Sequence, residues 1–182
     1  GNIGCIFSAY IRPYASSVVT EPMYRFNKLN LSELRHDLRV NYYLIERYKQ
    51  AKESGKFRSV SFITERELID EVLIEEEDKI TDSNYTRKIE KLKRHLSDGI
   101  LIVETLDGRV NRTAIEYELT QKAKGTYEKI LRKYQLSSDR NDLDSVIYIV
   151  KGRRIQRKIE QVMSENNYSF NIRFYDADET FE

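Results

Sequence analysis

Two apolar segments joined by a tight turn carry carboxylates at positions where a sheet would bury them. Residues 98–104 and 110–119 have the composition of strands, and the Asp-Gly pair between them is a strong signal for a β-hairpin. Asp98 opens the first segment, and alternation places Glu116 and Glu118 on one face of the second. Because a buried carboxylate is costly unless it is paired or binds a metal ion, this hairpin constrains both the fold and the chemistry.

The segments around the hairpin predict alternating helices and strands. Asn30 with Glu33 and Thr64 with Glu67 form capping boxes that start two of the helices. A continuously apolar run over 146–150 is typical of an interior strand that is covered on both faces. Helices are therefore expected over residues 30–52, 64–77, 121–135 and 153–165, a short basic helix or turn over 86–95, and further strands over 57–63, 146–150 and 168–175.

The first of these helices carries a stripe of large apolar side chains at helical spacing. A stripe of this kind predicts the face of a helix that packs against the core of the protein. We therefore expect the buried face of the first helix to consist of Leu31, Leu34, Leu38, Tyr42 and Ile45.

The composition excludes several classes of protein. The 182 residues fit one domain of ordinary size, and a hydrophobic content of 40% is enough for a packed core. A net charge of +1 means that any surface for nucleic acid must be a local patch. The single cysteine, Cys5, excludes an internal disulfide framework, and no apolar run reaches the roughly 18 residues of a membrane span. We therefore expect a cytoplasmic protein that has no membrane partner.

The carboxylates of the hairpin predict a metal site. If the two strands pair through their turn, Asp98 approaches Glu116 or Glu118, and converging carboxylate oxygens suit Mg²⁺ or Mn²⁺. Lys122, expected at the head of the next helix, would stabilise charge that develops on a phosphate. The alternative is that the two glutamates form a solvated strand face and that Asp98 begins a simple turn.

Histidines and basic clusters flank these carboxylates in the sequence. His36 and His95 are candidates to support a phosphate or the metal, although a packing or helix-capping role is the alternative for each. The basic clusters are expected to contact a DNA backbone, the alternative being solvated helix faces. The DNA-contacting residues proposed from these clusters are Lys91, Lys93, Arg94, Arg153, Arg154 and Arg157.

The order of the elements looks like that of the restriction-endonuclease-like fold. That fold belongs to the mixed α/β (α+β) class and has an αβββαβ core, which here would carry a C-terminal αβ extension and a mixed sheet flanked by helices. Several segments also resemble the replication-relaxation family, which includes MobC-like plasmid mobilisation proteins. These segments are 34–41, 95–100, 114–122, 127–134 and 146–150.

The resemblance implies a domain similar to PD-(D/E)xK nucleases over residues 29–176. Residues 1–28 would be an arm or the remnant of an upstream winged-helix domain, and 177–182 would be an acidic tail. The implied setting is plasmid mobilisation, conjugation or replication, with plasmid origin DNA and a relaxase as partners. The implied metal site is that of Asp98, Glu116 and Glu118.

Departures from the nuclease pattern leave three hypotheses open. Ser97 stands where the pattern has proline before the aspartate, and Glu118 or Thr120 stands where it has lysine. The first hypothesis is a Mg²⁺- or Mn²⁺-dependent DNA endonuclease. The second is an inactive accessory module that binds DNA or a relaxase, and the third is a protein-interaction domain without DNA contact.

Overall fold

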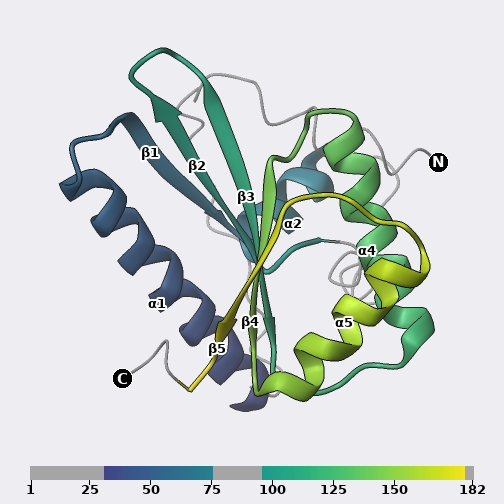
Figure 1. The fold of residues 1–182 in the computed structure, drawn as a ribbon. Helices are drawn as coiled ribbons and strands as arrows, with labels where there is room; N and C mark the ends of the chain where they lie inside the picture. The colour runs from purple at the N-terminus through teal and green to yellow at the C-terminus, as the bar shows by residue number, and fades with distance from the viewer. Residues whose placement is uncertain (1–30, 76–95, 179–182) are drawn as a thin grey trace.

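A single sheet organises the computed structural model, which describes residues 31–75 and 96–178. The sheet has five strands in the order β1-β2-β3-β4-β5. The described elements are α1 (Leu31–Glu53), β1 (Phe57–Thr64), α2 (Glu65–Glu75), β2 (Gly99–Thr105), β3 (Val110–Glu118), α4 (Lys124–Asp139), β4 (Ser145–Val150), α5 (Arg153–Glu165) and β5 (Ile172–Asp176) (Figure 1).

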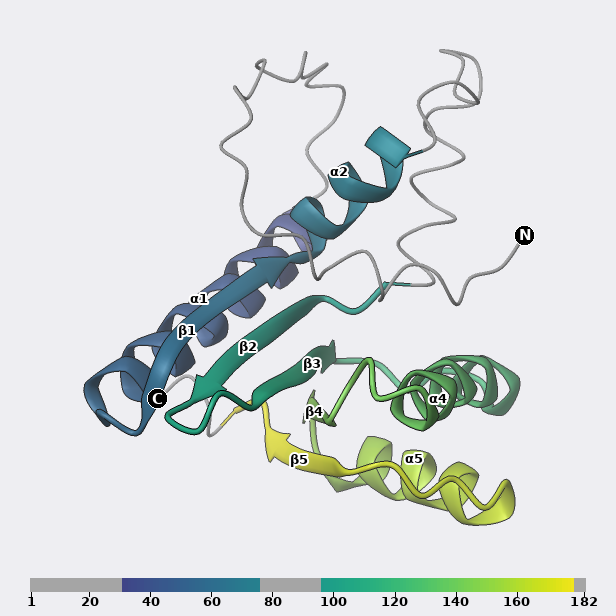
Figure 2. The same ribbon diagram turned by 90° about the horizontal axis from the view of Figure 1, so that it is seen from above.

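The sheet is mixed, with helices on both faces. β1, β2 and β3 form an antiparallel meander, and β4 and β5 add to it in parallel. Figure 2 shows α1 on one face and α4 with α5 on the other. The described residues form three core clusters. One packs α4 and α5 around Tyr148, one packs α1 against Ile115 and Ile149, and a smaller one packs Leu68 of α2 against Ile100 of β2. The expected αβββαβ order with a C-terminal αβ extension is therefore confirmed, as is the mixed α/β class with a mixed sheet flanked by helices.

The buried face of α1 is not the one expected from the leucine stripe. Val40, Tyr43 and Leu44 are buried against the sheet, whereas Leu34 and Leu38 are exposed, as are Tyr42 and Ile45. Periodicity identifies an apolar stripe but does not fix which side of the helix meets the sheet. The observed rotation also turns His36 towards the sheet, where its polar partners are Tyr117 of β3 and Asp98, which directly precedes β2.

A glycine lets α1 pack closely on the hairpin. A Cβ added at Gly99 would lie 2.7 Å from Leu44 Cδ1 and 3.2 Å from the Ile63 carbonyl oxygen. Any larger residue at this position would require the Leu44 side chain and the Ile63 carbonyl to shift. The glycine that follows Asp98 therefore brings the helix next to the first of the predicted site carboxylates.

Of the predictions made from local sequence signals, one is confirmed and two helix or strand boundaries are wrong. The Thr64 capping box is confirmed, since the Thr64 N–H donates to Glu67 Oε2 at 2.7 Å and the Glu67 N–H donates to Thr64 Oγ1 at 3.3 Å. The helix expected from residue 121 begins at Lys124 because Ala123 is extended (ψ 151°), so Lys122 lies in the preceding loop. The last strand begins at Ile172 and not at residue 168.

Several expectations fall on residues that the structure does not describe. These are the arm at 1–28, the Asn30 cap, the basic helix or turn at 86–95 and residues 179–182. Ala177 is buried, and its N–H donates to the Val150 carbonyl oxygen at 2.9 Å. Within residues 31–75 and 96–178, no helix has the length and apolar character needed to cross a membrane.

Candidate functional site

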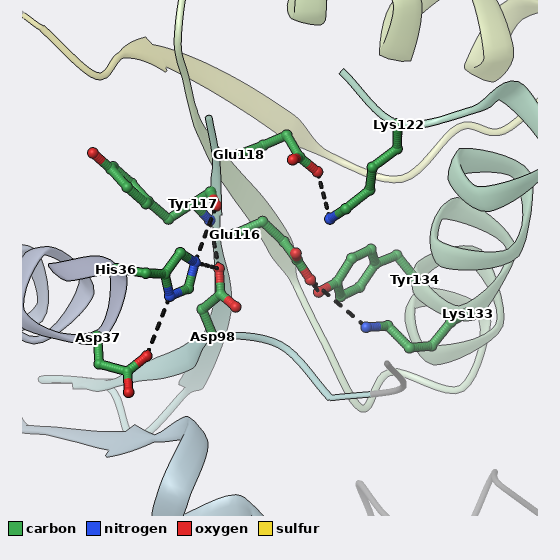
Figure 3. A network of polar contacts seen from close by, with 9 residues as sticks. All are labelled: His36, Asp37, Asp98, Glu116, Tyr117, Glu118, Lys122, Lys133 and Tyr134. Carbon is green, nitrogen blue, oxygen red and sulfur yellow. Dashed lines mark hydrogen bonds and ion pairs between the residues drawn. The ribbon is translucent and has the colours of Figure 1, made fainter. Parts of the chain in front are cut away.

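The register of the hairpin brings the predicted carboxylates to one end of the sheet. Gly99 pairs with Ile115, so Asp98 reaches the C-terminal half of β3. The Asp98 N–H donates to the Ile115 carbonyl oxygen at 3.1 Å, and the Asp98 carboxylate accepts the Tyr117 N–H at 2.6 Å. The backbone N–H and the carboxylate of Asp98 are therefore both hydrogen-bonded to β3. Figure 3 shows this carboxylate between His36 and Glu116.

Glu116 lies in a buried polar cluster with two neighbouring residues of α4. The Tyr134 hydroxyl donates to Glu116 Oε1, and Lys133 Nζ lies 3.7 Å from the same oxygen and 4.0 Å from the centre of the Tyr134 ring. Burial raises the pKa of Glu116 to about 7, which the Lys133 charge opposes and the Asp98 charge assists. Burial also lowers the pKa of the Lys133 ammonium.

Glu118 has its own lysine. Lys122 Nζ lies 2.5 Å from Glu118 Oε2, and the Lys122 backbone N–H donates to the Tyr127 hydroxyl at 3.1 Å. Burial raises the pKa of Glu118 even though Lys122 lowers it. For Lys122, burial lowers the pKa, but the charges of Glu118 and Glu116 outweigh burial and raise it. The loop before α4 therefore supplies the cation that compensates the second glutamate.

His36 compensates Asp98 from the opposite side of the sheet. Its Nε2 lies 3.4 Å from Asp98 Oδ2 and 3.2 Å from the Tyr117 carbonyl oxygen, and its Nδ1 lies 3.3 Å from Asp37 Oδ1. Burial lowers the pKa of His36, but Asp37, Asp98 and the carbonyl together raise it to about 10. His36 is therefore an imidazolium at neutral pH, with N–H donors on both ring nitrogens.

Three carboxylates and three cations thus share one end of the sheet. The charge of Asp98 raises the pKa of both Glu116 and Glu118, so the three carboxylates interact with one another. In the described part of the chain, no three Asp, Glu, His or Cys side chains lie close enough together to hold a metal ion in this arrangement. The carboxylate oxygens are nevertheless the donor type that Mg²⁺ and Mn²⁺ prefer.

The structure places only some of the other predicted residues. Exposed side chains at the start of α5 are those of Arg153, Arg154 and Arg157. The Lys151 N–H donates to the Glu118 carbonyl oxygen at 3.1 Å, so the chain entering α5 passes beside the backbone at the end of β3. Outside the described residues lie His95, Lys91, Lys93 and Arg94.

Sequence reasoning missed the role of α4. Tyr134 and Lys133 both contact Glu116, and neither is among the residues predicted for the site. The signal that could have drawn attention to Lys133 is its place beside a core tyrosine, at the border between the polar and apolar faces of the helix. At such a position a lysine can bury its aliphatic chain against the core and direct its ammonium group towards a buried partner.

Comparison with known proteins yields one distant likeness. No protein-family model matches the chain, and no curated protein matches it. Among solved structures, the pre-specific restriction endonuclease BsaWI in complex with DNA is 12% identical, with a TM-score of 0.33, over 78% of this chain and 54% of that one. The chain thus spans about half the length of that endonuclease chain. A likeness at this level carries no argument about activity.

Proposed function

We propose that this chain is a DNA-processing domain whose carboxylate cluster is a Mg²⁺- or Mn²⁺-dependent nuclease site. The observation that carries the proposal is the cluster itself: Asp98, Glu116 and Glu118 lie at one end of the sheet, two of them buried, and each faces a cation. Charges are costly to bury, and their concentration at one point is typical of functional sites.

Each residue has a distinct role in this proposal. Asp98, Glu116 and Glu118 would hold the metal ion, which when bound polarises a phosphate and lowers the pKa of a bound water. Lys122 and Lys133 would stabilise negative charge on the phosphate oxygens, since both ammonium groups already lie beside the carboxylates. His36 would position Asp98 through its ion pair.

DNA would reach this end of the sheet along the start of α5. The arginines there are exposed, and the chain leading to them is bonded to Glu118. Guanidinium groups pair well with phosphates, and contacts to phosphates position DNA without reading its bases, so we expect this surface to bind DNA of any sequence. The resemblance to the replication-relaxation family suggests plasmid origin DNA as the substrate and a relaxase as a partner.

A second function is favoured by a specific feature of the same cluster. Each carboxylate already has a side-chain cation of its own, so the buried charges are balanced by the protein alone. A domain in this state could keep the fold and bind DNA or a relaxase as an inactive accessory module. The two functions differ in whether a divalent ion displaces these internal partners.

Cleavage of supercoiled plasmid and of single-stranded DNA with Mg²⁺ or Mn²⁺ separates the two functions. The nuclease proposal predicts metal-dependent nicking by the wild type, its loss in Asp98→Asn, and normal nicking by Glu104→Gln. Glu104 is a matched control because it lies on β2, the strand that Asp98 precedes, and pairs with Arg58, away from the cluster. DNA binding without cleavage by any variant would support the accessory module.

The DNA surface is tested by the dependence of binding on salt. Replacing Arg153 and Arg157 by glutamine should weaken binding for all sequences and reduce the slope of log affinity against log salt by about 2. Arg58→Gln, on β1, is the control that should leave the slope unchanged. No measurable affinity for DNA at low salt would support the protein-interaction domain instead.

A further inference from the structure

The outward face of α1 carries a row of large apolar side chains. The exposed fractions are 38% for Leu34, 59% for Leu38, 54% for Tyr42 and 40% for Ile45. Their spacing of three and four residues keeps them on one side of the helix, opposite the buried Val40. Figure 1 shows α1 as the outermost described element on its side of the sheet.

This row differs from the other exposed apolar residues of the described chain. Leu106 and Val110 lie at the hairpin turn, and Leu136 is a single residue on the outer side of α4. Scattered apolar residues of that kind are normal on a protein surface, whereas a contiguous apolar strip marks an interaction site. The row on α1 therefore indicates an interface.

We propose that a second copy of this chain covers the row, with the two α1 helices packed antiparallel about a two-fold axis. In such a pair the N-terminal half of each helix lies beside the C-terminal half of the other. Residues along one edge of a helix therefore lie beside residues along the same edge of the second helix. Leu38 then meets Tyr42 of the second copy, and Leu34 meets the turn that contains Ile45. The interface does not depend on the proposed nuclease function.

Charge at the edge of the row supports this partner and this orientation. Arg35 and Glu46 are eleven residues apart, close to three helical turns, so they flank the row on the same side. Antiparallel packing about a perpendicular two-fold axis places Arg35 of each copy beside Glu46 of the other. Glu46 also accepts a bond from Lys49 in its own helix at 3.0 Å, and a carboxylate has room for a second donor.

The size of the row sets the expected strength of the dimer. α1 has 23 residues, which makes it about 35 Å long. An interface confined to two such helices falls at the low end of the range for specific complexes, below about 1,200 Å² in total. We therefore expect a dimer that dissociates in the micromolar range and is visible only in a concentration series.

Sedimentation velocity of the 182-residue chain over a series from about 1 to 300 µM, a range that brackets a micromolar dissociation constant, tests the dimer. The wild type should shift from monomer to dimer, Leu38→Glu should weaken the association at least about tenfold, and Leu136→Glu should leave it unchanged. Leu136 is the matched control because it is a leucine of similar exposure, 47% against 59%, on another helix. Circular dichroism and thermal unfolding confirm that each variant is folded.

Charge reversal identifies the second copy as the occupant. Arg35→Glu and Glu46→Arg should each weaken the dimer, and the double variant should recover it because the opposite charges meet again across the axis. A wild type that stays monomeric throughout the series overturns the proposal and leaves the row to another segment or another protein. A dimer that survives Leu38→Glu, or a double variant that is not rescued, also overturns it.

Discussion

Glu116 and Asp98 both form ion pairs at the end of the sheet, but the two pairs differ in how far they are exposed to solvent. Glu116 pairs with Lys133 on the α4 face, where the two side chains are 9% and 12% exposed. Asp98 pairs with His36 on the α1 side, where they are 17% and 30% exposed (Figure 3). The first pair is buried, so each of its charges is stable only while the opposite charge is present. The second keeps contact with solvent, so under the proposed function it is the side from which a phosphate or a hydrated ion would approach.

The largest expected effect comes from breaking the buried pair. Lys133→Met removes the cation that keeps Glu116 ionised above its pKa of about 7, which should lower the free energy of unfolding at pH 9 by about 3 kcal/mol in urea denaturation. The double variant Lys133→Met with Glu116→Gln should recover most of this loss, because the Tyr134 hydroxyl keeps an acceptor. A loss below about 1 kcal/mol for Lys133→Met would mean that solvent reaches Glu116.

A smaller effect is expected on the more exposed side. Asp98→Ala removes the acceptor of the Tyr117 N–H and the ionic partner of His36, and should cost about 2 kcal/mol in the same assay. Asp98→Asn retains an oxygen for the Tyr117 N–H and should cost about half as much. Equal losses in the two variants would show that the charge of Asp98, and not its hydrogen bond to β3, stabilises the strand end.

The ion pair of Lys122 with Glu118 is intermediate between these two pairs, because one partner is buried and the other is exposed. Glu118 is 5% exposed at its side chain, but Lys122 is 39% exposed, so solvent screens the interaction. Lys122→Met should therefore cost only about 1 kcal/mol of unfolding free energy, clearly less than Lys133→Met. If the two lysine variants lost the same amount, the distinction between a buried and a partly solvated cation would be wrong.

The smallest effect is a dependence on pH. The folded state raises the pKa of His36 from 6.5 to about 10, so the charged imidazolium stabilises the fold. This contribution is complete below pH 6.5 and is lost as the pH rises through about 10. The difference in unfolding free energy between wild type and His36→Gln should thus shrink over this window by about 0.5–1 kcal/mol after screening. A difference that grows with pH would contradict the assigned ion pair.

Much of the site could be predicted because its signals are local. Strand alternation places Glu116 and Glu118 on one face, and a two-strand hairpin with a short turn fixes where Asp98 meets them. The capping box at Thr64 is equally local, since its two partners are three residues apart. These features depend on neighbours in the sequence, so the sequence alone was sufficient.

The rest depends on how helices rotate when they pack. The leucines of α1 face outwards because Val40, Tyr43 and Leu44 meet the sheet, and no periodicity distinguishes the two sides. In the same way, only the packing of α4 on β3 brings Lys133 to Glu116 across 17 positions of sequence. Contacts of this kind come from tertiary structure, which overrides local pattern.

Binding of Mn²⁺ to the full chain, followed by electron paramagnetic resonance, tests the central claim most directly. The account predicts a bound ion in the wild type at millimolar Mn²⁺ or below, weakened at least about tenfold in Asp98→Asn and unchanged in Glu104→Gln. No binding by the folded wild type, or binding that Asp98→Asn leaves intact, would contradict a metal site built on these carboxylates. The cluster would then be an internally balanced polar core of an accessory module.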